Sequence, residues 1–272
     1  MSDWLSIHRG EAPLIVSIPH AGTEIPREIE ARLVSPWRAR RDADWHIPTL
    51  YEFAKAMGAT VVTTSISRTV IDVNRDPSGA SLYPGQATTA LCPLTTFDGE
   101  ELYLKAKAPG EDEIDERRGR WFLPYHAALY EEIRRLKRTH NSVVLYDAHS
   151  IRSQIPRLFE GVLPVFNIGT NSGRSCALEL ATAAQMICAG SGQPTVANGR
   201  FKGGHITRLY GDPDRGVHTL QMELAMRVYM REPHVPDEDN WPTAFDAAIA
   251  EPTQATLKRV LNACLTFARE AT

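Results

Sequence analysis

The sequence lacks the features that define several common classes of protein. No run of apolar residues approaches the roughly 20 that a membrane-spanning helix needs. The net charge is only −3, from 30 basic and 33 acidic side chains, so there is no basic excess to displace counterions from a nucleic acid. The N-terminal residues contain no apolar stretch typical of a secretory signal. We therefore expect neither a membrane protein nor a general nucleic-acid binder.

Cysteine is also scarce, and the four cysteines have no C-x-x-C spacing. They are Cys92, Cys176, Cys188 and Cys264. This pattern excludes a disulfide framework and a zinc knuckle, and it favours reduced thiols in a cytoplasmic protein. No repeat, low-complexity tract or Gly/Ser linker divides the 272 residues, of which 43% are hydrophobic. We expect a single α/β domain over residues 1–272.

Short apolar runs alternate with helical patterns along the chain. Buried strands are predicted at residues 13–18, 59–64, 70–73, 142–146, 162–168, 194–197 and 217–224. Helices are predicted at residues 47–57, at 111–140 with an interruption at Pro124, at 176–188 and over the last 30 or so residues, and residues 82–109 are predicted to be mostly loop. The alternation predicts a parallel or mixed sheet covered by helices on both faces. Ligands of such sheets bind outside the carboxyl ends of the strands.

Polar side chains of chemical interest follow several of the predicted strands or lie at their carboxyl ends. They are His20, Asn74, Arg75, Asp147, His149 and Glu223. Two histidines and a carboxylate form the protein ligand set of a catalytic zinc site, which keeps one position open for water. We expect His20 and His149 to be the nitrogen ligands. Asp147 is placed to hold one imidazole ring in the right tautomer.

Three carboxylates could complete this metal site. Asp44 opens a helical segment and can point into a crevice, whereas Glu24 is near His20 in sequence but lies among turn residues. Asp42 is a third candidate, and either Asp42 or Asp44 could instead be a helix N-cap. Because no short zinc signature such as H-E-x-x-H is present, the residues alone leave the choice open.

Basic residues gather beside the predicted strand 70–73 and in the loop 198–208. They are Arg68, Arg75, Arg200, Lys202 and Arg208. Guanidinium groups and the backbone N–H groups of a glycine-rich loop suit a carboxylate or a phosphate, although a solvated basic loop has the same composition. The glycines match neither a P-loop nor a dinucleotide-binding fingerprint. We therefore expect a small acidic ligand that is not a nucleotide.

Seven blocks of the sequence, taken together, carry a resemblance to a known family. They are residues 17–22 (SIPHAG), 42–46 (DADWH), 71–77 (IDVNRDP), 91–94 (LCPL), 147–152 (DAHSIR), 198–204 (NGRFKGG) and 221–224 (QMEL). In this order they resemble the N-formylglutamate amidohydrolases, over about residues 12–230. The family is similar in fold to zinc carboxypeptidases, so the resemblance implies a three-layer α/β/α phosphorylase/hydrolase-like fold with a central mixed sheet. It also implies hydrolysis of N-formyl-L-glutamate to formate and L-glutamate, in histidine degradation.

The resemblance also implies a ligand set for the metal. His20 matches the first metal histidine and His149 the last. The peptidase pattern H-x-x-E is absent, because Thr23 stands where the glutamate would be, and the resemblance points instead to Asp44. The expected metal is Zn²⁺ or another divalent transition metal such as Co²⁺.

Roles in catalysis and substrate binding are implied in the same way. Glu223 matches the general base, Asn74 and Arg75 resemble the pair that grips a substrate carboxylate, and Arg68 is expected to help stabilise the oxyanion. The substrate carries two carboxylates, so its site needs at least two positive groups. Arg75, Arg200, Lys202 and Arg208 can supply them. Two alternatives stay open: a related amidohydrolase acting on another N-acyl acidic amino acid, and a module that binds a dicarboxylate without chemistry.

Overall fold

A seven-stranded sheet forms the centre of the structure, a computed structural model that describes residues 3–80, 85 and 88–270. The strands are β1 (Leu5–His8), β2 (Leu14–Ile18), β3 (Thr60–Thr64), β4 (Val143–Ile151), β5 (Phe166–Gly169), β6 (Thr195–Ala197) and β7 (Val217–Ala225). The α-helices are α1 (Arg27–Glu30), α2 (Pro36–Arg40), α3 (Ile47–Leu50), α4 (Phe53–Ala56), α5 (Glu111–Arg117), α6 (Leu123–Lys137), α7 (Leu178–Ala189), α8 (His205–Tyr210) and α9 (Ala247–Glu270). A π-helical turn (Arg118–Phe122) joins α5 to α6, and 3-10 turns occur at Pro213–Arg215 and Met226–Val228.

The sheet is mixed, with the strand order β1-β3-β2-β4-β7-β5-β6. Strands β3, β2, β4 and β7 are parallel, whereas β1 pairs with β3 and β5 pairs with β7 in the antiparallel sense. Because the inner strands are covered on both faces, they are near-continuous apolar runs that sequence periodicity detects well. On the β4–β7 pair, His149 lies opposite Glu223.

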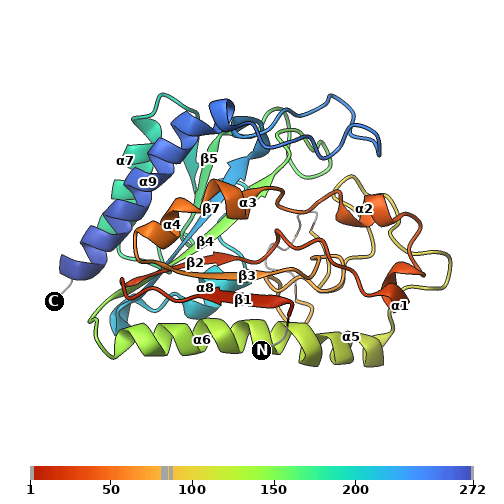
Figure 1. Ribbon diagram of the computed structural model, residues 1–272, viewed down its shortest axis with the longest axis horizontal. Coiled ribbons are helices and arrows are strands. Elements are labelled where there is room, and N and C mark those ends of the chain that lie inside the picture. The colour runs from red at the N-terminus through yellow and green to blue at the C-terminus, as the bar shows by residue number, and fades with distance from the viewer. Residues whose placement is uncertain (1–2, 81–84, 86–87, 271–272) are drawn as a thin grey trace.

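Helices cover both faces of the sheet, which confirms the predicted three-layer α/β/α architecture (Figure 1). On one face, Leu129 of α6 packs in a buried cluster with Ile15 of β2 and with residues of β4. On the other face, α7 and α9 pack against Val16 of β2 and Leu220 of β7. None of the described helices is both long and apolar enough to cross a lipid bilayer.

Several predicted elements differ from the structure. Residues 70–73 were predicted as a strand but form turns and irregular backbone. The helix predicted at 47–57 is divided into α3 and α4, and β1 was not predicted. The predicted interruption at Pro124 is a π-helical turn followed by the first turn of α6, so the helical path continues. In the predicted loop at 82–109, residues 82–84 and 86–87 lie outside the described residues.

Strand β4 is longer at its carboxyl end than the predicted run at 142–146. Asp147 and His149 lie within β4 rather than after it, whereas Glu223 lies within β7, as the predicted strand at 217–224 indicates. The polar residues therefore project from the regular part of the sheet, where their backbone positions are fixed by ladder hydrogen bonds.

Candidate active site

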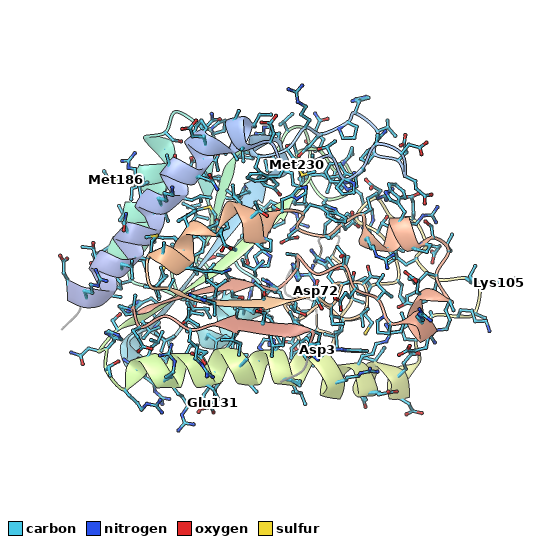
Figure 2. All side chains as sticks on the ribbon, viewed as in Figure 1. Asp3, Asp72, Lys105, Glu131, Met186 and Met230 are labelled. Carbon is cyan, nitrogen blue, oxygen red and sulfur yellow. The ribbon has the colours of Figure 1, made fainter. Side chains whose placement is uncertain are left out.

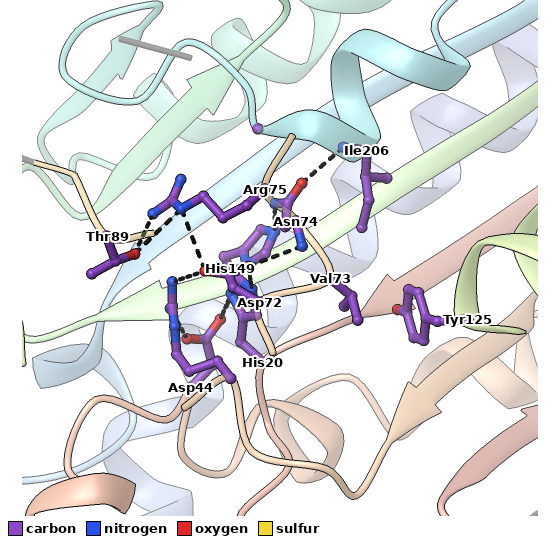
Figure 3. Close-up of polar contacts among 12 residues, drawn as sticks. His20, Asp44, Asp72, Val73, Asn74, Arg75, Thr89, Tyr125, His149 and Ile206 are labelled. Carbon is purple, nitrogen blue, oxygen red and sulfur yellow. Dashed lines mark hydrogen bonds and ion pairs between the residues drawn. The ribbon is translucent and has the colours of Figure 1, made fainter. Parts of the chain in front are cut away.

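Two histidines and an aspartate meet at the carboxyl edge of the sheet, and all three are buried. His20 follows β2, Asp44 lies in the turn before α3, and His149 lies in β4 (Figure 3). One ligand atom from each lies within 4.8 Å of those of the other two. The Nδ1 atoms of His20 and His149 lie 3.8 and 3.1 Å from Asp44 Oδ2. The structure thus brings together the three residues predicted as metal ligands.

The surroundings of Asp44 fit a bound cation. Its Oδ2 atom accepts a hydrogen bond from the Ser150 backbone N–H at 3.1 Å, but its buried Oδ1 atom has no hydrogen-bond partner. The Arg68 guanidinium is 3.7 Å from Oδ1, which is beyond hydrogen-bond distance. A buried carboxylate oxygen without a partner is costly, and a cation held between the three side chains would satisfy it. Two imidazoles and a carboxylate are a ligand set typical of catalytic zinc.

Each imidazole turns its other nitrogen toward a buried carboxylate. His20 Nε2 lies 2.7 Å from Asp72 Oδ1, and His149 Nε2 lies 3.0 Å from Asp147 Oδ2. If each Nε2 carries the proton and donates it, Nδ1 keeps its lone pair for a metal, which is how an outer carboxylate orients a histidine ligand. Asp147 thus lies beside His149, where it was expected. The sequence did not indicate this role for Asp72, because residues 70–73 were predicted to form a strand.

Burial and charge act in opposite directions on these groups. Burial would lower the pKa of His149, but the carboxylates of Asp147 and Asp44 raise that pKa well above its ordinary value. The pKa of His20 is lowered by burial and by the nearby Arg68 guanidinium. Burial would raise the pKa of Asp72, yet His20 and Arg68 hold it well below its usual range. Asp72 is therefore a charged carboxylate in the interior.

Glu223 faces the triad from the neighbouring strand β7. Burial raises the pKa of Glu223 to about 8, with the Asp44 carboxylate adding to this shift and His149 opposing it. A carboxyl group whose pKa lies near neutrality can both take and return a proton. Glu223 and the triad histidines line the same cavity.

Arg68 lies beside Asp44 and is itself buried. Its Nη2 atom donates to Asp72 Oδ2 at 2.7 Å, and its guanidinium carbon is 4.8 Å from the centre of the Phe97 ring. These two contacts hold the cation in the wall of the cavity, where positive charge can act on a bound anion or oxyanion.

The cavity beside the triad is small and lined by positive groups. Its volume is about 60 Å³. Asn74, Arg75 and Arg200 line it, but Lys202 and Arg208 are not among the described residues that do so. Arg208 Nε donates to the Gly203 carbonyl at 3.2 Å. The structure therefore brings three of the five predicted substrate-binding residues to the cavity.

Asn74 ties the loop carrying Arg75 to the rest of the site. Its side-chain Oδ1 accepts from the Ile206 backbone N–H at 2.8 Å, and its Nδ2 donates to Asp147 Oδ2 at 3.2 Å. A Cβ atom at Gly204 would lie 2.5 Å from the Asn74 amide, so this close approach requires glycine. Asn74 thus joins the start of α8 to β4.

The two alternative carboxylates do not reach the histidines. Glu24 is exposed, and its backbone pairs with Ile66. Asp42 Oδ2 accepts from the Phe97 backbone N–H at 2.6 Å, and Asp42 also pairs with Arg152. The geometry leaves Asp44 as the carboxylate beside His20.

Comparisons with known proteins show what the whole chain is similar to. Residues 12–230 match the family model described as N-formylglutamate amidohydrolase. The N-formylglutamate deformylases of Pseudomonas aeruginosa and Pseudomonas putida are 44% and 45% identical to this chain over 271 residues, which is 99% of this chain and 99% and 98% of theirs. The crystal structure of N-formylglutamate amidohydrolase from Ralstonia eutropha JMP134 aligns with a TM-score of 0.80 over 99% of both chains, at 22% identity, and shows a shared fold.

Proposed function

The chain belongs to the N-formylglutamate amidohydrolase family, and we propose that it hydrolyses N-formyl-L-glutamate to formate and L-glutamate. The observation that carries this proposal is the buried triad facing Glu223 across one small cavity. We also propose that the whole chain acts as one catalytic unit, because residues of β4, of β7 and of several irregular segments far apart in the sequence contribute to this cavity.

His20, Asp44 and His149 are proposed to hold one divalent transition metal, Zn²⁺ or a substitute such as Co²⁺. Such an ion, when bound, lowers the pKa of water and polarises a carbonyl group. Asp72 and Asp147 lie beside Nε2 of the two rings, so a proton kept on each Nε2 would leave the Nδ1 atom of that ring to bind the metal.

Glu223 is proposed to act as the general base and then as the general acid. Its carboxylate takes a proton from the attacking water, whose oxygen adds to the formyl carbon. The carbon–nitrogen bond then breaks, and the same proton passes to the departing amino group of glutamate. Burial favours the proton-bearing form that this second transfer requires.

The arginines account for the charges of the substrate. Arg68, held by Asp72 beside Asp44, is proposed to stabilise the oxyanion that develops on the formyl oxygen. Arg75 and Arg200 line the same cavity and are proposed to bind the two carboxylates of the substrate, with Asn74 positioning Arg75. Two guanidinium groups suffice for two carboxylates, so the proposal assigns no contact to Lys202 or Arg208.

The proposal is tested by measuring formate release from N-formyl-L-glutamate before and after chelation. We expect release by the metal-loaded protein, loss of release with a chelator, and recovery with Zn²⁺ or Co²⁺. Binding of glutamate without formate release by the metal-loaded protein would instead support a dicarboxylate-binding module. Faster turnover of N-succinyl-L-glutamate would support a related amidohydrolase with another acyl preference.

A further inference from the structure

One wall of the cavity is apolar, in contrast to the charged groups around the triad. Phe97 and Ile151 line this wall, and both are buried. They belong to one hydrophobic cluster, against which Leu158 also packs. The Phe97 ring lies over Arg68, with its centre 4.8 Å from the guanidinium carbon. The apolar wall therefore begins directly beside the group proposed to stabilise the oxyanion.

Phe97 is held in place through its backbone. Its N–H donates to Asp42 Oδ2 at 2.6 Å, and its carbonyl accepts from Arg157 Nη1 at 3.3 Å. A Cβ atom cannot move far when both backbone polar groups of its residue are bound by side chains from other segments. Phe97 is thus fixed before any ligand binds.

The residues on both sides of Phe97 are also fixed. Arg41 donates to Thr96 Oγ1 at 2.9 Å and pairs with Asp98 at 2.8 Å. Arg152, which directly follows β4, pairs with Asp98 as well. The loop that carries the Phe97 ring is therefore held by contacts on both sides of Phe97, so the wall cannot move far to admit a larger ligand.

We infer that Phe97, supported by Ile151, limits the acyl group of the substrate to formyl. This inference rests on the proposed function, which places the carboxylates at Arg75 and Arg200 and the reacting carbonyl at Arg68. With its oxygen at Arg68, the acyl carbon lies next to Phe97, which stacks on that guanidinium, and its remaining substituent faces the apolar wall. In N-formylglutamate this substituent is a hydrogen atom, whereas in N-acetylglutamate it is a methyl group that meets the fixed ring.

Steric exclusion by one methyl group has a known scale. Discrimination by one extra carbon in a tight pocket is typically about 10–200-fold in kcat/KM. Rejection by a rigid wall is also how a site disfavours a competitor without gaining affinity for its own substrate. Removing the wall should therefore raise the kcat/KM for the acetyl substrate relative to that for the formyl substrate. Folding and metal content should stay close to those of wild type.

The test compares L-glutamate release from N-formyl-L-glutamate and N-acetyl-L-glutamate, because both reactions yield this product. For Phe97→Ala we expect the acetyl-to-formyl ratio of kcat/KM to rise at least tenfold over wild type. Phe159→Ala is the matched control, since Phe159 packs against the same cluster but does not line the cavity. Its ratio should equal that of wild type.

Two further variants keep the inference testable if Phe97→Ala does not fold. Phe97→Leu shortens the wall while keeping its apolar packing, and Ile151→Ala opens it from β4. Each should raise the ratio by a smaller factor. An unchanged acetyl-to-formyl ratio in folded Phe97 variants that still hydrolyse the formyl substrate would overturn this inference and leave the proposed function intact. Absence of formyl hydrolysis by wild-type protein would overturn the proposed function, and the inference with it.

Discussion

Asp72 Oδ1 lies 2.7 Å from His20 Nε2, so a fully buried carboxylate supports one of the proposed metal ligands. Its other oxygen accepts from Arg68 Nη2 at 2.7 Å. The same oxygen lies 3.5 Å from Arg75 Nε (Figure 3). Figure 2 shows Asp72 in the interior of the molecule, whereas Glu131 projects from its periphery. One carboxylate thus connects the metal site to Arg68 and Arg75, two of the three arginines that are proposed to meet the substrate.

Asp72→Asn is expected to weaken metal binding by about 10–100-fold, because an outer carboxylate orients the histidine and raises its basicity. Competition with a chromophoric chelator measures the metal dissociation constant directly. Asp76→Asn is the matched control, since Asp76 Oδ1 accepts from the backbone N–H and the hydroxyl of Ser78 and does not contact His20. Equal metal affinity in Asp72→Asn and wild type would remove Asp72 from the support of the metal site.

The parallel core of the sheet could be predicted because its strands are apolar on both faces, but polar residues within strands could not be assigned. The apolar run of β4 stops at Tyr146, and the strand continues through Asp147 and His149. These side chains stay buried because other parts of the chain satisfy them, as Ser17 Oγ does for Asp147 Oδ1 at 3.0 Å. Such partners are remote in sequence, so local periodicity cannot indicate them.

The error at residues 70–73 has a similar origin. The short run Val-Ile-Asp-Val, rich in β-branched residues, favours a strand, but Asp72 Oδ1 accepts from the Asn74 backbone N–H at 2.9 Å and bends the chain into a turn. A side chain that binds its own backbone competes with strand pairing. The choice of Asp44 over Glu24 likewise depends on where two loops meet in space, and here only the family resemblance pointed to the residue that the structure brings to His20.

Glu223→Gln is expected to lower kcat by about 10²–10⁴-fold, the usual contribution of a general base. The amide cannot accept the proton of the water. Because it has nearly the same shape as the carboxyl group, metal content should not change. Steady-state formate release and metal analysis of the same sample measure the two effects. Glu179→Gln, which alters an exposed carboxylate on α7, should leave both unchanged. Turnover within a few-fold of wild type in Glu223→Gln would assign the proton transfer to another group.

Arg75→Ala is expected to raise KM by about 10–100-fold, because a hydrogen bond to a charged group contributes about 1.5–3 kcal/mol. The effect on kcat should be smaller, and Arg75→Lys should recover part of the loss by restoring the charge without the planar fork. Initial rates over a range of N-formyl-L-glutamate concentrations separate the two constants. Arg215→Ala, at an exposed position, serves as the control. A wild-type KM in Arg75→Ala would place the carboxylate site elsewhere.

Metal removal is expected to lower thermal stability as well as activity. A ligand present at 100 times its dissociation constant stabilises the native state by about 2.7 kcal/mol, which corresponds to a Tm shift of roughly 5–10 °C in a protein of this size. Thermal unfolding followed with Zn²⁺, with a chelator and after Zn²⁺ is restored measures this shift. In His149→Ala the shift should be largely lost. A Tm of wild-type protein that responds to neither treatment would argue against a buried metal site.

His126 on α6 is expected to make the protein less stable below neutral pH. Its Nε2–H donates to the Val73 carbonyl at 2.8 Å, and its Nδ1 lies 3.0 Å from the Tyr210 hydroxyl. Burial lowers the pKa of His126 to about 4; the Val73 bond and Asp147 oppose this shift, and His205 adds to it. The unfolded chain, with an ordinary histidine pKa of about 6.5, therefore takes up a proton at a higher pH than the folded protein does.

The contribution of His126 to stability is therefore complete above about pH 6.5 and is lost as the pH falls toward 4, by up to about 3 kcal/mol. Because other groups titrate in this range, the informative quantity is the difference between variants. Between pH 7 and pH 4.5, the free energy of unfolding of His126→Gln, measured with urea, should fall less than that of wild type. His8→Gln, at an exposed position in β1, should follow wild type. Parallel curves for wild type and His126→Gln would mean that His126 binds protons equally in the folded and unfolded states.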